Sequence, residues 1–145
     1  MSAPSLAALV DAFFKRSFSI HEAAQLFGPE GPALRPNVIP LGPSNAAFSS
    51  VWLELLRVEP APKPPFVCGL SLRLVRPAPG WLDEIERRLG RGREMPRLKP
   101  DEPIPYQFLV RGLDHDGYVL VRVDDGPRAA RGAILRRFPP TLAAK

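Results

Sequence analysis

The stretch "YQFLVRGLDHDGYVLVRVDDG" at residues 106–126 decides the fold class of this chain. Two runs rich in valine, leucine and aromatic residues flank Asp-His-Asp-Gly, and aspartate and glycine are typical of turns. Two such runs joined by a turn predict an antiparallel β-hairpin. A further run, "GAILRRF" at 132–138, predicts a last strand after the hairpin. We therefore expect a mostly antiparallel sheet in the second half of the chain.

A strand and an amphipathic helix are predicted upstream of this hairpin. The stretch "FVCGLSLRLVR" at 66–76 alternates in polarity with a period of two, which indicates a strand. Its predicted apolar face consists of Phe66, Cys68, Leu70, Leu72 and Leu74, and its other face of Gly69, Ser71 and Arg73. The stretch "GWLDEIERRLG" at 80–90 has apolar residues at helical spacing and a glycine at its end, which predicts a helix inserted between strands.

The N-terminal part of the chain predicts two short helices. Residues 5–14 and 19–27 carry apolar side chains at helical spacing. Ser19 and Glu22 have the spacing of a capping box, in which each side chain accepts a hydrogen bond from a free N–H of the first turn. Gly28 favours an end to the second helix, because glycine readily adopts a positive φ.

Two more segments complete the predicted sheet. Residues 48–58 favour a strand, and residues 36–41 favour a short one. The sequence therefore predicts an α+β fold with two short N-terminal helices and a mostly antiparallel sheet of about five to six strands. One amphipathic helix, at 80–90, is expected between strands.

Proline is unusually frequent and is concentrated between the predicted elements. The chain has 19 prolines in 145 residues, against a usual share of about 5%. They cluster in three predicted connecting loops at 29–43, 60–65 and 96–105. Proline restricts the backbone of a loop, so such loops lose little entropy when they bind. A length of 145 residues fits one domain, and we expect residues 1–145 to form a single globular domain.

The excess positive charge lies in the second half of the chain. Residues 73–145 hold fifteen basic and ten acidic groups, whereas residues 1–72 hold five of each. Codon bias in a GC-rich genome would also raise the arginine content. The densest stretch is "RRLGRGREMPRLKP" at 87–100. The candidate partner-binding residues are Arg87, Arg88, Arg91, Arg93, Arg97, Lys99, Arg136 and Arg137.

The residues that usually carry catalysis do not form a recognisable pattern. Cys68, the single cysteine, falls on the apolar face of a predicted strand, where a thiol acts as a small core residue. His21 follows a helix cap and His115 falls in the hairpin turn, so nothing predicts that they meet. The acidic candidates form two pairs, Asp114 with Asp116 and Asp124 with Asp125. A predicted strand of about 26 Å separates the two pairs, so they cannot bind the same ion. We expect no catalytic residue, no cofactor and no metal site.

These features predict a non-catalytic binding protein: an adaptor, an inhibitor of the immunity type, or an accessory subunit. Arginine pairs with carboxylates through two parallel hydrogen bonds, so the expected partner is a protein with an acidic surface. One alternative is an accessory protein that binds nucleic acid without sequence preference, through residues 87–99 together with Arg128, Arg131, Arg136 and Arg137. The arginine-rich loop lacks the aromatic side chains on which bases stack.

A second alternative is an enzyme or small-ligand-binding domain whose unrecognised site lies under the sheet. The sequence has no apolar run long enough to span a membrane and no signal-peptide pattern at its start, so we expect a cytoplasmic protein that does not engage membranes. Nothing in the sequence indicates the oligomeric state.

Overall fold

The computed structural model describes residues 4–42, 46–124 and 126–139, which form three helices and seven strands. The helices are α1 (Leu6–Phe13), α2 (Ile20–Phe27) and α3 (Pro79–Leu89). The strands are β1 (Val38–Leu41), β2 (Phe48–Leu55), β3 (Val67–Ala78), β4 (Arg93–Glu94), β5 (Ile104–Val110), β6 (Gly117–Val123) and β7 (Ala130–Arg137). The strands form one sheet in the order β1-β2-β3-β7-β6-β5-β4, with antiparallel neighbours throughout. The α+β class and the antiparallel sheet are confirmed.

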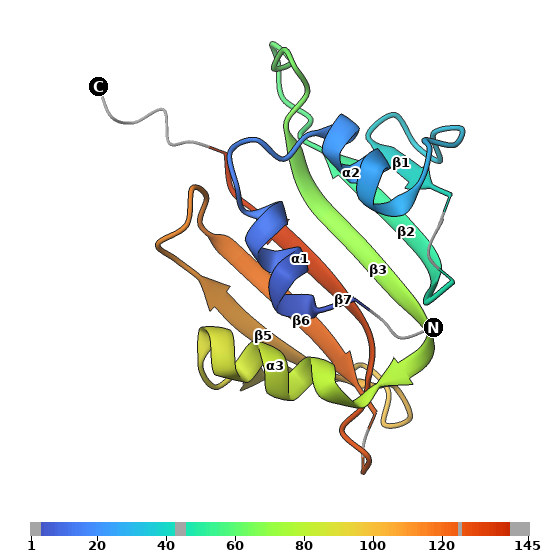
Figure 1. Ribbon diagram of the computed structural model, residues 1–145, viewed down its shortest axis with the longest axis vertical. Helices are drawn as coiled ribbons and strands as arrows, with labels where there is room; N and C mark the ends of the chain where they lie inside the picture. The colour runs from blue at the N-terminus through green and yellow to red at the C-terminus, as the bar shows by residue number, and fades with distance from the viewer. Residues whose placement is uncertain (1–3, 43–45, 125, 140–145) are drawn as a thin grey trace.

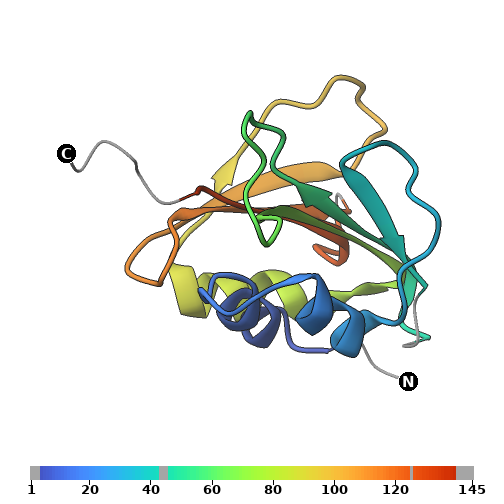
Figure 2. The same ribbon diagram turned by 90° about the horizontal axis from the view of Figure 1, so that it is seen from above.

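All three helices lie on the same face of the sheet (Figure 1). We call this the covered face, and it presents strand side chains such as Leu53, Leu72 and Leu135 to the helices. Figure 2 shows the helices on one side of the sheet, while the loops at 29–37 and 95–103 rise on the other. We call this other side the open face, and Trp52, Ser71 and Ile134 belong to it. Within the described residues, no helix packs on the open face.

The hydrophobic core fills the space between the helices and the covered face. From the helices it takes Leu6, Leu9, Val10, Phe13, Ala23, Phe27, Trp81, Leu82 and Ile85. From the strands it takes Val51, Leu53, Leu70, Leu72, Phe108, Val119, Val121 and Leu135. Burying a side chain of the size of leucine contributes about 1.5–3 kcal/mol, so this layer supplies most of the stability. None of the described helices is long and apolar enough to cross a membrane.

A carboxylate from α3 closes the N-terminal end of α1. The Ser5 hydroxyl accepts a hydrogen bond from the Ala8 N–H at 3.2 Å, as an N-cap does. The Glu84 carboxylate accepts from the Ser5 hydroxyl at 2.6 Å and from the Ala7 N–H at 2.7 Å. Its negative charge therefore lies at the positive end of the α1 dipole and ties α3 to α1 through two residues, Ala7 and Glu84, that are 77 positions apart in the sequence.

The predicted limits of α2 and α3 are largely confirmed. The Ser19 hydroxyl accepts from the Glu22 N–H at 3.3 Å, which is one half of the expected capping box. No reciprocal bond from the Glu22 side chain forms within the described residues. Gly28 and Gly90 end their helices with φ of +117° and +90°, a backbone conformation that favours glycine.

The expected number of strands was too low, because β4 lies inside the predicted arginine-rich loop. β4 has two residues, Arg93 and Glu94, which pair with Gln107 and Tyr106 of β5. Two residues are too few to show an alternating pattern, so the sequence gives no sign of this edge strand. The hairpin turn also differs from the prediction, since β5 ends at Val110 and a six-residue connection at 111–116 precedes β6.

The predicted core position of Cys68 was wrong. The register places Val67 opposite Leu55 but Gly69 opposite Glu54, so Cys68 is an extra residue on β3. Such a β-bulge changes the alternation of the strand. Val67 therefore takes the core position, and Cys68 is only half-buried.

Candidate functional site

The open face presents its side chains in three rows across the sheet, because residues paired in register lie on the same face. The central row is Pro40, Trp52, Ser71, Ile134, Leu120, Gln107 and Arg93. One flanking row is Val38, Glu54, Gly69, Arg136, Tyr118 and Leu109. The other is Ser50, Arg73, Gly132, Arg122 and Pro105. Among these residues there are four arginines and one carboxylate, so the face is basic with apolar side chains between the charges.

Trp52 is the large exposed aromatic residue in the central row. Its side chain is 44% exposed, although its neighbours Val51 and Leu53 are buried on the covered face. Two hollows of the open face meet at Trp52, which lines both. Tryptophan and arginine are the residue types that most often dominate the energy of a protein interface. The arrangement therefore has the composition of a binding surface.

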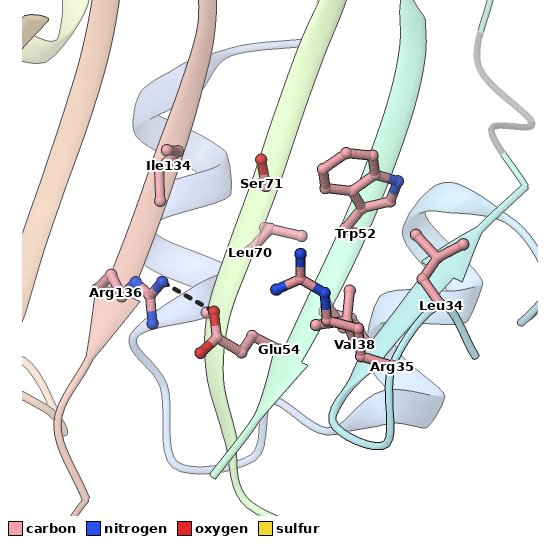
Figure 3. Close-up of a pocket in the computed structure, with 11 residues that line it drawn as sticks. Leu34, Arg35, Val38, Trp52, Glu54, Leu70, Ser71, Ile134 and Arg136 are labelled. Carbon is pink, nitrogen blue, oxygen red and sulfur yellow. Dashed lines mark ion pairs between the residues drawn. The ribbon is translucent and has the colours of Figure 1, made fainter. Parts of the chain in front are cut away.

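The first of these, the apolar hollow, has a volume of about 360 Å³ and is lined by Leu34, Val38, Trp52, Ile134 and the charged residues named next. Figure 3 shows Trp52, Ser71 and Ile134 on three adjacent strands, with the Arg136–Glu54 ion pair beside them. The two charged groups are 2.8 Å apart. Burial lowers the pKa of Arg136, but the hydrogen bond and charge of Glu54 raise it by more, so the guanidinium stays charged. Arg35 adds a second cation from the loop that precedes β1.

The second, the arginine hollow, has a volume of about 470 Å³. Its cations are Arg73 on β3, Arg122 on β6 and Arg131 on β7. Arg131 is the extra residue of a β-bulge, since Gly132 pairs with Arg122 and Ala130 with Val123. Its Nε donates to the Asp124 carboxylate at 2.6 Å. Ser50, Ser71 and Trp52 form other parts of the wall.

Two of the proline-rich loops border these hollows. Leu34 and Arg35, from the loop at 29–37, line the apolar hollow, and Pro103, from the loop at 95–103, lines the arginine hollow. The Arg97 guanidinium donates to the carbonyl oxygens of Pro100 and Glu102 at 3.0 and 3.2 Å. Arg97 thus holds the second loop in shape.

Arg137, a predicted partner-binding residue, is buried and cannot reach a partner. Its side chain is 3% exposed. The guanidinium donates to the carbonyl oxygens of Val67, Phe13, Lys15 and Phe18 at 2.6, 3.0, 2.8 and 2.9 Å. Its centre lies 4.7–5.6 Å from the ring centroids of Phe13, Phe18 and Phe66. Burial lowers its pKa to about 10, so Arg137 remains a cation and takes the place of a cap at the C-terminal end of α1.

The other seven predicted residues are accessible but do not converge. Arg136 belongs to the open face, and Arg93 lies in the same face at the β4 edge. Arg88, on α3, forms an ion pair with Asp11 of α1 at 2.7 Å. The exposed residues Arg87, Arg91 and Lys99 are spread over α3 and the segments that follow it. Of the residues added for nucleic acid, Arg128 pairs with Glu86 at 3.5 Å and Arg131 with Asp124.

Among the described residues, those considered for catalysis do not form a reactive group. Burial, followed by the charge of Glu54, raises the pKa of the Cys68 thiol, which makes it a weaker nucleophile at neutral pH. His115 lies in the connection between β5 and β6, as expected, but it is buried, and its Nδ1 lies 3.1 Å from the Phe138 carbonyl oxygen. His21 is exposed on α2. No cluster of three potential metal ligands occurs within the described ranges, which leave out Asp125.

Sequence reasoning missed Trp52, Arg73 and Arg122 as a group. The signal was present in part: the alternation in 66–76 placed Arg73 and Ser71 away from the apolar face. What the sequence lacked was the strand order, which brings Arg73 and Arg122 to either side of β7. Comparison of the chain with protein-family models, with curated proteins and with solved structures returned no match.

Proposed function

We propose that this chain is a non-catalytic binding protein that holds an acidic protein partner on its open face. The observation that carries the proposal is Trp52, exposed at the meeting point of two hollows on a face whose strands offer four arginines and one carboxylate. An acidic partner would be attracted by the net positive charge, and Trp52 would supply the apolar contact. An adaptor, an inhibitor or an accessory subunit of a cytoplasmic assembly would each use such a face.

The dimensions of the open face suit a protein. Seven strands spaced about 4.8 Å apart span about 29 Å. A standard protein interface buries about 800 Å² on each partner, which corresponds to a square with a side of about 28 Å. The loops at 29–37 and 95–103 border the face and would add contacts at both edges.

A protein partner fits the open face better than a nucleic acid does. Aliphatic residues surround Trp52 in the central row, namely Ile134, Leu120 and Pro40. Single-stranded nucleic acids are held by successive aromatic platforms, and the central row offers one aromatic residue.

Site-specific cross-linking in the native cells tests the proposal. A photoreactive p-benzoylphenylalanine replaces Trp52 in one variant and Leu26 in the control, because Leu26 is similarly exposed, at 45%, on the outer side of α2. We expect position 52 to yield a discrete adduct with a protein rich in Asp and Glu, and position 26 to yield none. The adduct at position 52 should survive nuclease treatment. Its yield should fall when cross-linking is carried out at a higher salt concentration, because salt weakens the non-covalent complex that precedes it.

Two outcomes would contradict the proposal. Equal adducts at both positions would mean that the open face has no preferred partner. An adduct that disappears with nuclease would indicate that nucleic acid occupies the face and would favour the alternative.

A further inference from the structure

We infer that the arginine hollow is a carboxylate subsite, which takes the side chain of an Asp or Glu from an extended acidic segment of the partner. This inference rests on the proposed function and adds to it the part of the partner that is recognised. It assigns separate roles to the two hollows: the arginine hollow binds a carboxylate, and the apolar hollow beyond Trp52 binds an apolar side chain.

The backbone of the central strands leaves room for an anion between two arginines. Arg73 and Arg122 lie on either side of Gly132 in one row of the open face. Their strands are two spacings apart, or about 10 Å, and the glycine between them fills none of that space. A Cβ at position 132 would collide with the Leu72 carbonyl oxygen, so the close approach of β3 and β7 requires glycine here.

Among the residues that the structure describes, Arg73 and Arg122 have no counter-charge. Within the described residues, the side chains of Arg73 and Arg122 form neither an ion pair nor a hydrogen bond. Of the described residues that line the arginine hollow, none is a carboxylate, although Asp124 holds Arg131 from outside it. By contrast, Arg136 in the apolar hollow is already paired with Glu54. An added anion would therefore bind most favourably beside Arg73 and Arg122, because their guanidinium groups can still form charge-assisted hydrogen bonds.

The spacing of the two hollows matches an extended polypeptide. Along β3, the row of Arg73 and the row of Ser71 are two residues apart, and two residues of a strand span about 6.6 Å. A segment that runs along the strands also presents alternate side chains about 6.6 Å apart. A carboxylate in the arginine hollow would thus lie two residues from an apolar side chain at Trp52. The expected recognition pattern is an acidic residue and an apolar residue separated by one residue, in the order set by the direction of the segment.

A peptide of defined sequence tests the subsite without knowledge of the partner. The probe is the fluorescein-labelled heptapeptide Glu-Ser-Leu-Ser-Glu-Ser-Leu, and the control peptide has glutamine in place of glutamate. Fluorescence polarisation measures the binding of each peptide to three proteins: the wild type, the Arg73→Gln/Arg122→Gln variant and the Arg87→Gln/Arg91→Gln variant. The second double variant removes the same charge from two exposed arginines on α3 and the segment after it. Thermal melts confirm that both variants fold, and Arg122→Gln alone replaces the first variant if that one melts early.

We expect the Arg73→Gln/Arg122→Gln exchange to lower the affinity for the glutamate peptide about tenfold, which is the effect of losing one charge-assisted hydrogen bond. The Arg87→Gln/Arg91→Gln exchange should change the affinity less than about twofold, because distant exposed charges are screened by salt. The glutamine peptide should bind the wild type no better than the glutamate peptide binds the first variant.

An equal loss in the two double variants would overturn the inference, since the peptide would then sense net charge and no particular hollow. Tighter binding of an oligothymidylate of the same charge, lost in the Arg73→Gln/Arg122→Gln variant, would overturn it in favour of phosphate. The proposed function can fail separately. If the peptide behaves as expected but position 52 cross-links no protein in cells, the subsite stands and the partner assignment falls.

Discussion

The two faces of the sheet use the same types of residue in opposite ways, and the comparison is clearest on β7. Arg137 points to the covered face, where four carbonyl oxygens and three aromatic rings surround it. Arg136, the residue before it, points to the open face and pairs with the half-exposed Glu54. The two tryptophans differ in the same way, since Trp81 is 3% exposed and donates to the Pro4 carbonyl oxygen, whereas Trp52 is 44% exposed. A residue type therefore says little about its role until its face is known.

The difference between the faces separates stability from binding. On the covered face, the charge of Arg137 and the aromatic rings around it are fully used by contacts within the chain. On the open face, Trp52 exposes apolar surface, and the guanidinium groups of Arg73 and Arg122 have hydrogen-bond donors that no described residue of the chain uses. Substitutions on the covered face should thus affect unfolding, and substitutions on the open face should affect binding.

The largest effect is expected for Arg137→Met, which should lower the free energy of unfolding by about 3–5 kcal/mol. The substitution keeps an apolar stem but removes the guanidinium donor from the buried carbonyl oxygens of Val67, Phe13 and Phe18. The part-buried Lys15 carbonyl oxygen still accepts from the Phe18 N–H. Arg136→Met is the matched control and should cost less than about 1 kcal/mol, because its ion pair is partly exposed. Urea denaturation followed by circular dichroism measures both. Similar losses for the two variants would contradict the contrast between the faces.

The next largest effect concerns the adjacent apolar residues Leu135 and Ile134. Leu135 is fully buried on the covered face, and Leu135→Ala should cost about 2–5 kcal/mol through lost burial and the cavity left behind. Ile134 lies on the open face, so Ile134→Ala should cost less than about 1.5 kcal/mol, the cost of losing partly buried apolar area. Chemical denaturation of the two variants tests this, and a larger loss for Ile134 would show that the open face is packed after all.

A smaller effect is expected for the cap of α2. Ser19→Ala removes the hydroxyl that accepts from the Glu22 N–H and should cost about 0.5–2 kcal/mol. Ser50→Ala, on the open face, removes a hydroxyl that serves no cap and should change stability by less than about 0.5 kcal/mol. Melting curves of the two variants distinguish these outcomes, and an unchanged Ser19→Ala protein would mean that the cap contributes nothing.

The smallest effect is a pH dependence that arises from His115. Burial lowers the pKa of His115, and the charge of Arg137 lowers it further, although the Phe138 carbonyl and Asp114 act in the opposite direction. The unfolded chain therefore binds the proton more readily than the folded protein. The free energy of unfolding should fall as the pH drops below about 6.5, the ordinary pKa of histidine.

The His115→Gln variant isolates this contribution. Urea denaturation at pH 7.5 and at pH 5.5 should show a smaller loss of stability on acidification for the variant than for the wild type. A constant difference between the two proteins at both pH values would mean that His115 is protonated equally in the folded and unfolded chain.

Local sequence patterns predicted most helices and strands of this fold. The wrong predictions concern residues whose positions depend on contacts with segments far away in the sequence. The helix at 80–90 and the strand at 66–76 were predictable because periodicity and a terminal glycine lie within the segment itself. The position of Cys68 was not, because the bulge depends on how β3 pairs with β2. Arg137 was taken for a surface residue because its carbonyl acceptors at Phe13, Lys15 and Phe18 lie more than 115 residues away.

The candidate site depended even more on the strand order. The open face could not be recognised from residues 87–100, where the positive charge is densest along the chain. Arg73 and Arg122 lie on strands that are separated in sequence by α3 and two other strands, and β7 inserts between them in the sheet. Because β7 lies between these two strands, Arg73 and Arg122 line the same hollow although they are far apart in the sequence.

Tryptophan fluorescence during a titration tests the central claim, that the open face and not the covered face receives an acidic partner. The glutamate heptapeptide is added without its label to the wild type and to Trp52→Phe, so that the difference between the two signals reports Trp52 and the variant alone reports Trp81. We predict that the Trp52 signal shifts to shorter wavelength and becomes protected from acrylamide as the peptide binds, while the signal of the buried Trp81 stays constant. A binding curve in which Trp81 changes and Trp52 does not would contradict the account.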